Sequence, residues 1–182
     1  MSPTPSRVEL WPLTLADQDE FCSLVRASTE LHAPWMQLPT TSGEFQDWMR
    51  RFSDGTSLGF LIRVQETGAA AGMVNINSII RGRYQGASLG YAAFVPSAGR
   101  GYMTEGLTVA LRHAFNDLRL HRLEANIQPA NKASSALVQR LGFRYEGLSP
   151  AYLYIDGAWR DHERWSITTP LPWTPDPSLP RV

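Results

Sequence analysis

The chain has 182 residues, of which 43% are hydrophobic, so it is long and apolar enough to form one globular domain with its own core. Lys plus Arg and Asp plus Glu each total 17; the resulting formal net charge of zero argues against a nucleic-acid binder that neutralises phosphates. The single Cys22 excludes an intrachain disulfide, and no apolar run predicts a membrane span or signal peptide, so we expect a cytoplasmic protein.

The N-terminal part predicts a strand followed by two helices. Residues 8–13 form the expected strand, and Thr14 with Asp17 resembles a helix start, a capping residue with an acid in the first turn. The segment 32–35, His-Ala-Pro-Trp, should end this helix because the residue before a proline avoids the helical region. Ser42 is expected to cap the second helix. The apolar side of that helix would carry Phe45, Trp48, Met49 and Phe52.

Three strands are expected next. Residues 58–64 and 71–80 are apolar runs, and the Gln-Glu-Thr-Gly segment at 65–68 predicts a hairpin turn between them. Residues 81–86 are a polar connection, and residues 88–95 are rich in apolar and aromatic side chains, which is typical of a buried strand.

The stretch 94–106 joins this strand to a helix predicted over 107–118, where apolar residues recur at helical spacing. The first N–H groups of a helix have no internal partner, and the glycines of the stretch allow close approach of a ligand. Together with Arg100, these features indicate an anion site, usually for phosphate. The stretch is neither a Walker loop nor a dinucleotide fingerprint, because the residues that define those motifs are missing.

The remainder of the chain predicts a strand, a helix and a hairpin. Residues 122–127 alternate apolar and polar side chains, which indicates a strand with one buried face. Asn131 can cap the following helix and Gly142 can end it. The Asp-Gly pair in the segment 152–162 predicts a hairpin turn, and the proline-rich end of the chain predicts a tail without regular structure.

The segment 96–107 resembles the acetyl-CoA loop of the GNAT N-acetyltransferases, whose pattern is Gln/Arg-x-x-Gly-x-Gly/Ala. Gly101 fills the central glycine, whereas Ala98 stands where Gln or Arg is usual and Met103 where a small residue is usual. The run Gly-Tyr-Met-Thr-Glu is typical of the RimJ/RimL branch of the family, which acetylates protein N-termini.

Two further segments extend the resemblance. Asn-x-x-Ser followed by Leu-Gly-Phe, at 131–143, is a second hallmark of the family and lies beside the pantetheine arm and thioester of its members. Many relatives carry a tyrosine where this chain has Val138, and the RimL branch has a serine that matches Ser134. The terminal hairpin at 152–162 closely resembles that of ribosomal-protein alanine N-acetyltransferases.

The resemblance implies an α+β GNAT fold: a mixed, mostly antiparallel sheet flanked by helices, with splayed parallel strands at 88–95 and 122–127 holding acetyl-CoA. It implies one GNAT domain over residues 1–169 and a proline-rich tail at 170–182. No metal is expected, because the four histidines are scattered and the cysteine has no Cys-x-x-Cys partner.

Site residues follow from the matched positions. The pyrophosphate of acetyl-CoA should lie on the N–H groups of residues 99–104, and the pantetheine along residues 94 and 95. The expected cofactor-binding residues are Phe94, Val95, Gly99, Arg100, Gly101, Tyr102, Met103, Thr104 and Asn131. Ser134 is the expected catalytic residue, which assists departure of the thiolate, or else it only caps or packs the helix. Trp35 and Tyr152 are the expected acceptor-binding residues.

The reaction should be direct attack of a neutral amine on the thioester, without an acyl-enzyme, and Cys22 should be a core residue. An α-amino group has a pKa near ~8, so a modest base suffices. Asp156, Asp161 and His162, or a water held by them, are the candidates for this base. The alternative is that these residues stabilise the hairpin, which is the interpretation we prefer for Asp156.

The expected function is acetyl transfer from acetyl-CoA to a protein N-terminus, such as that of a ribosomal protein, by a monomer or homodimer that binds neither nucleic acid nor membrane. The alternatives are acetylation of a small amine, such as an antibiotic or polyamine, and a non-catalytic domain that senses acyl-CoA. An acidic acceptor cleft would favour the small amine.

Overall fold

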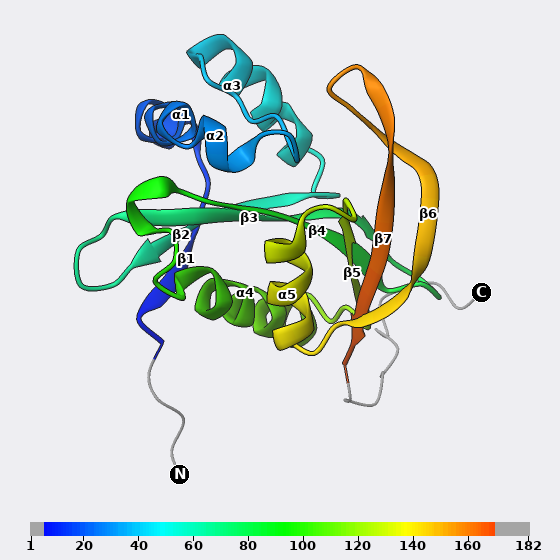
Figure 1. Ribbon diagram of the computed structural model, residues 1–182. Coiled ribbons are helices and arrows are strands. Elements are labelled where there is room, and N and C mark those ends of the chain that lie inside the picture. Colours follow the sequence, from blue (N-terminus) through cyan, green and yellow to red (C-terminus); the bar gives the residue numbers. More distant parts are fainter. Residues whose placement is uncertain (1–5, 170–182) are drawn as a thin grey trace.

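Figure 1 shows the computed structural model, which describes residues 6–169; the tail expected at 170–182 lies outside the described residues. Seven strands form one mixed sheet in the order β1-β2-β3-β4-β5-β7-β6. The strands are β1 (Val8–Pro12), β2 (Leu58–Val64), β3 (Ala70–Ile80), β4 (Gly86–Ala93), β5 (Arg122–Ile127), β6 (Arg144–Ile155) and β7 (Ala158–Thr168). The helices are α1 (Gln18–Ala27), α2 (Thr29–His32), α3 (Ser42–Met49), α4 (Tyr102–Arg112) and α5 (Lys132–Arg140).

The pair β4–β5 is parallel, as predicted, whereas the other neighbouring strands of the described sheet run antiparallel. Pairing between β4 and β5 is confined to Gly86–Ser88 and Arg122–Glu124, near the start of both strands. Beyond these residues the two strands no longer pair with each other, although β4 continues to Ala93 and β5 continues to Ile127. The predicted splay is therefore present, and it opens a wedge in the middle of the sheet.

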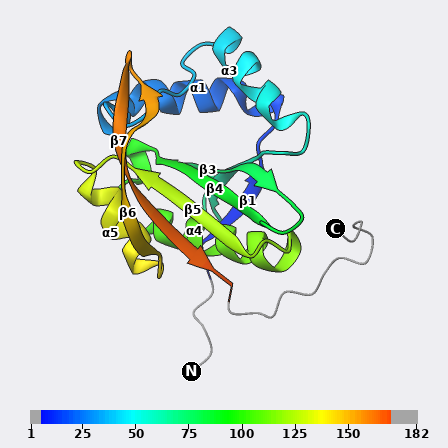
Figure 2. The same cartoon turned by 90° about the vertical axis from the view of Figure 1, so that its right-hand side faces the viewer.

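Helices cover both faces of the sheet: α1, α2 and α3 lie on one side, and α4 and α5 on the other (Figures 1 and 2). Adjacent side chains of a strand point to opposite faces, so Leu61 packs with the α1–α3 layer and Ile62 packs under α4. Gly106 allows α4 to approach the sheet closely, because a Cβ atom there would lie 2.6 Å from Ile62 Cδ1. The wedge is thus held between two separate hydrophobic cores.

Several local predictions are confirmed. The side-chain oxygen of Asn131 accepts a hydrogen bond of 3.1 Å from Ser134 N–H and so caps α5. Gly142 follows the end of α5 with a φ of +91°, the left-handed conformation that ends many helices. Asp156 and Gly157, with φ of +49° and +74°, form the turn of the β6–β7 hairpin, which is longer than the predicted 152–162 segment.

Three boundaries were predicted wrongly. The cap of α3 is Thr41 rather than Ser42: Glu44 N–H donates to the Thr41 hydroxyl and Glu44 Oε2 accepts from Thr41 N–H, a capping box. Helix α4 begins five residues earlier than position 107, at Tyr102, directly after Gly101, which is its N-cap in the left-handed conformation. Strand β4 ends at Ala93 rather than residue 95, because Val95–Ser97 form a short 3₁₀ turn that contains a proline.

Candidate active site

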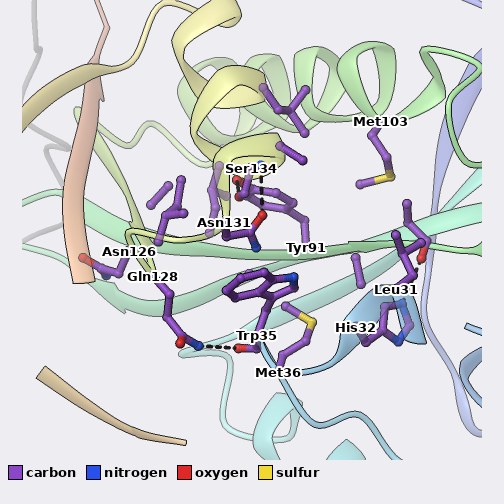
Figure 3. Close-up of a pocket in the computed structure, with 18 of the residues that line it drawn as sticks. Leu31, His32, Trp35, Met36, Tyr91, Met103, Asn126, Gln128, Asn131 and Ser134 are labelled. Atoms are coloured by element: carbon purple, nitrogen blue, oxygen red, sulfur yellow. Dashed lines mark hydrogen bonds between the residues drawn. The ribbon is translucent and has the colours of Figure 1, made fainter. Parts of the chain in front are cut away.

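A cavity of about 260 Å³ lies in the wedge between β4 and β5. Figure 3 shows how α5 and its N-cap residue contribute Ser134 and Asn131 from one side, while α2 and the segment after it contribute His32, Trp35 and Met36 from the other. The cavity therefore gathers residues from both helical layers and both central strands. Its lining consists of Leu31, His32, Trp35, Met36, Leu89, Gly90, Tyr91, Ala92, Ala93, Met103, Ala125, Asn126, Ile127, Gln128, Asn131, Ala133, Ser134, Leu137 and His162.

The predicted anion loop connects β4 to α4. Gly99 and Gly101 have φ of +77° and +82°, which few residues other than glycine adopt, and Gly101 is the N-cap of α4. The loop thus turns its backbone into the first turn of α4, where N–H groups lack helical partners and the helix dipole is positive. Met103, on that first turn, lines the cavity, whereas the other loop residues expected to bind the cofactor, Gly99–Tyr102 and Thr104, do not.

Arg7 braces this loop, a contact that was not predicted. Its Nη2 donates to the carbonyl oxygen of Arg100 at 3.0 Å, and its Nε donates to Glu105 Oε1 at 2.8 Å. The guanidinium also lies 4.7 Å from the centroid of the Tyr102 ring. Hydrogen bonds from Arg7 lower the pKa of Glu105, so an ion pair persists at neutral pH beside the proposed phosphate site. No sequence pattern links two residues that are 98 positions apart.

The backbone N–H groups of Phe94 and Val95 are not free to pair with the pantetheine, which we expected to lie along these two residues. Phe94 N–H donates to Ala71 O at 2.9 Å, and Val95 N–H donates to the Ser28 hydroxyl at 3.0 Å. The Phe94 side chain is fully buried in the α1–α3 core, so it does not line the cavity either. The prediction that the pantetheine pairs with the backbone of Phe94 and Val95 is therefore wrong, because both N–H groups already donate within the protein.

The backbone groups that do face the wedge come from slightly earlier in β4. Successive residues of an antiparallel strand direct their N–H and C=O groups to opposite sides, and the N–H of Phe94 points toward β3. Ala93 and Tyr91 therefore direct their N–H and C=O groups away from β3, into the wedge. Consistent with this, Ala93 O accepts a hydrogen bond of 2.9 Å from His32 Nε2, on the cavity side.

Ser134 lines the cavity, and two contacts fix its position. Its backbone N–H is held by Asn131, and its Oγ lies 2.6 Å from the phenol oxygen of Tyr91. Burial raises the pKa of Tyr91 to about 12, so its phenol is protonated throughout the physiological range. Val138 is fully buried in the core under α4 and does not line the cavity. Tyr91 was missed because an aromatic residue in a strand is ordinarily a core residue.

The proposed acceptor residues are only partly brought together. Trp35 lines the cavity, and its carbonyl oxygen accepts a hydrogen bond of 3.2 Å from Gln128 Nε2 (Figure 3). Tyr152 does not line the cavity; the centroid of its ring lies 6.0 Å from that of His162, which does.

Of the three candidate bases, only His162 lines the cavity. Its Nδ1 lies 2.9 Å from the carbonyl oxygen of Arg160, which can only accept, so Nδ1 carries a hydrogen and the neutral ring presents a lone pair at Nε2. Asp161 instead accepts from Ala151 N–H at 2.8 Å, and Asp156 accepts from Gln37 at 3.2 Å. Asp161 therefore connects β7 to β6 within the hairpin, and Asp156 connects the hairpin turn to the segment between α2 and α3.

Among residues 6–169, no group of three His, Cys, Asp or Glu side chains could hold a metal ion. Within the same residues, no helix is long and apolar enough to cross a membrane. Cys22 is buried beside Thr41 in the α1–α3 core, and burial raises the pKa of its thiol, as expected of a core residue.

Residues 7–144 match the family described as the acetyltransferase (GNAT) domain, which is more than half of the chain. The chain belongs to the GNAT acetyltransferase family. Among solved structures, the RimJ of Mycobacterium smegmatis in complex with CoA-disulfide has 30% sequence identity and a TM-score of 0.81. That match covers 88% of this chain and 81% of the other.

Curated relatives of this GNAT protein match over a shorter range. The ribosomal protein uS5-alanine N-acetyltransferase of Escherichia coli is 43% identical over 104 residues, which are 57% of this chain and 53% of that protein. The probable N-acetyltransferase YjcK of Bacillus subtilis is 37% identical over 99 residues, 54% of this chain and 55% of that protein. The match thus spans about half the length of these curated relatives.

The residues of this GNAT chain fit acetyl-CoA. Two glycines in the left-handed region open the first turn of α4 to a phosphate, and the wedge leaves strand backbone unpaired beside it. These features would hold the pyrophosphate at residues 99–104 and the pantetheine along Tyr91 to Ala93.

Proposed function

We propose that this chain transfers the acetyl group of acetyl-CoA to the N-terminal α-amino group of a protein, in the manner of the ribosomal-protein alanine N-acetyltransferases. The observation that carries the proposal is the position of Ser134 and His162 on one cavity, which Met103 from the first turn of α4 also lines. A hydrogen-bond donor for the leaving group and a proton acceptor for the amine are the two groups that this reaction needs.

His162 serves as the base. With its hydrogen fixed on Nδ1 by the Arg160 carbonyl, Nε2 takes a proton from the incoming ammonium group, directly or through one water. Acetyl-CoA supplies the thioester as co-substrate, and the freed amine attacks its carbonyl carbon. Negative charge then develops on the carbonyl oxygen, where the wedge-facing N–H of Ala93 or Tyr91 can stabilise it.

Ser134 stabilises the departing sulfur. Its place on the first turn of α5, beside the wedge, allows the hydroxyl to donate a hydrogen bond as the C–S bond breaks. A serine hydroxyl is too weak an acid to give up its own proton, so it donates a hydrogen bond rather than acting as an acid.

The charge of the cavity supports a protein N-terminus over a polyamine. None of the residues that line it carries a carboxylate, whereas a site for a polycation needs several.

One observation favours the small-amine alternative: a neighbouring pocket of about 670 Å³ shares His32 and Met36 with the cavity and includes Glu44 and Asp156. A di- or polyamine could direct its far ammonium group toward those carboxylates.

The test compares acceptors at equal concentration: a peptide that begins with alanine, one that begins with lysine, a ribosomal-protein N-terminal peptide and spermidine. Mass spectrometry is expected to find acetylation on the α-amino group of the peptide that begins with alanine and of the ribosomal-protein peptide, and little on spermidine. Preferential acetylation of spermidine would replace the proposed acceptor with the small amine. CoA binding without acetylation of any acceptor would favour the non-catalytic alternative.

A further inference from the structure

The hydrogen bond between Tyr91 and Ser134 connects a strand of the wedge to the helix beside it. The two oxygens are 2.6 Å apart, and both residues line the cavity. Tyr91 also packs against the core under α4, so its ring has a fixed position. The short contact raises the question of which oxygen donates, because Ser134 has only one hydrogen to give.

Chemistry assigns the donor. A phenol is a far stronger acid than an aliphatic alcohol, so its O–H is the better donor, and the serine oxygen is the better acceptor. The phenol also stays protonated across the working pH range, since burial raises the pKa of Tyr91 to about 12. When Tyr91 donates, the hydrogen of Ser134 is free to point into the cavity.

We propose that Tyr91 is a positioning residue for acyl transfer: its phenol donates to Ser134 Oγ and thereby directs the Ser134 hydroxyl hydrogen toward the departing sulfur. The inference rests on the proposed acetyl transfer. A chain of two hydrogen bonds in the same direction polarises cooperatively, so each bond strengthens as charge builds on sulfur. The pair provides the hydrogen-bond donor that Val138, buried in the core, cannot provide.

Proton transfer along this chain does not go to completion. In the step, the amine nitrogen bonds to the acetyl carbon, the C–S bond breaks, and its electron pair stays on sulfur. A complete shift would protonate the thiolate and leave Tyr91 as a phenolate. The phenol has a pKa of about 12, whereas a thiol has a pKa of about 8.5, so the weaker acid would have to protonate the conjugate base of the stronger acid. That shift is unfavourable by roughly 10³-fold. The sulfur therefore leaves as a hydrogen-bonded thiolate. The amine nitrogen loses one proton before the attack and a second one as the amide forms, and His162 passes each of these protons in turn to solvent. One proton from solvent later protonates the thiolate.

The kinetic test uses Tyr91→Phe, which keeps the ring and removes only the phenol oxygen. We expect kcat to fall about 5-fold to 10-fold, with the KM for acetyl-CoA and the melting temperature nearly unchanged. Because Tyr91 acts through Ser134, the double variant Tyr91→Phe/Ser134→Ala should be no slower than Ser134→Ala alone. Tyr145→Phe, at an exposed tyrosine of β6 outside the cavity, is the matched control and should behave as wild type.

A second measurement requires no acceptor. The ultraviolet absorbance of the thiolate reports the pKa of the thiol of bound CoA, and Tyr91→Phe should raise that pKa by about 0.5–1 unit relative to wild type. A merely structural role would leave this titration unchanged.

The outcomes separate the two proposals. Multiplied losses in the double variant, or an unaltered thiol titration in Tyr91→Phe, would overturn the role of Tyr91 and leave the proposed function standing. A wild-type protein that acetylates no amine would overturn the proposed function, while the thiol titration would still decide whether Tyr91 orients Ser134.

Discussion

Gly101 offers the sharpest test of the anion loop. Its φ of +82° lies in the left-handed region, and a Cβ atom there would stand 3.4 Å from Arg7 Nη2. Gly101→Val adds two methyl groups beyond that Cβ, so the side chain meets the guanidinium that holds Arg100 O and Glu105. The substitution strains the backbone and crowds the mouth of the proposed phosphate site.

The magnitude follows from these two effects. A non-glycine residue in the left-handed region costs about 1–2 kcal/mol, and a β-branched one is worse. If the loop relaxes to escape this strain, at least one N–H bond to the charged pyrophosphate is lost, at about 1.5–3 kcal/mol. Since 1.4 kcal/mol is a factor of ten, the Kd for CoA should rise about 10-fold to 100-fold.

Calorimetric titration with CoA measures this effect, and Gly55→Val is the matched control. Gly55 has a similar φ of +74° in open surroundings, and it precedes β2 at the end of the sheet opposite the loop. Both variants should lose similar stability, but only Gly101→Val should lose affinity. A folded Gly101→Val protein with wild-type affinity would show that the loop does not bind the cofactor.

Three further predictions follow from the site and its surroundings. Replacing His162 with Gln should lower kcat at pH 7 by about 10-fold to 100-fold. The difference in kcat between wild type and variant should narrow by pH 9, because an α-amino group with a pKa of about 8 deprotonates unaided there. A difference in kcat that is constant with pH would argue against His162 as the base. Cys22→Ala should preserve turnover and sequential initial-rate kinetics, and a ping-pong pattern in wild type would contradict direct transfer. Hydrogen bonds from Arg122 and Ser166 lower the pKa of Glu146 to about 2, so its ionised form stabilises the folded state above its ordinary pKa near 4.5, and that stabilisation is lost as pH falls toward 2. Because Glu146 is about one-third exposed, Glu146→Gln should destabilise by only about 1 kcal/mol at pH 7 in urea titrations, and the difference should vanish near pH 2.

The local structure of this protein could be predicted from its sequence because short-range rules decide it. The cap at Asn131, the left-handed glycines at 99, 101 and 142, and the Asp-Gly turn each depend on residues a few positions apart. Even the error at the cap of α3 was local, since the Thr41-x-x-Glu44 capping box can be read in the sequence. Alternation and apolar periodicity identified the strands and most of the helices for the same reason.

Contacts within the site were decided only by the tertiary structure. Arg7 meets Glu105 across 98 positions, Val95 meets Ser28 across 67, and Tyr91 meets Ser134 across 43. Their partners depend on strand order and on which face each helix covers, neither of which leaves a local pattern in the chain. The same is true of the split between His162, which faces the cavity, and its neighbour Asp161, which does not. A strand turns successive side chains to opposite faces, so only the sheet into which the hairpin folds determines which one meets the wedge.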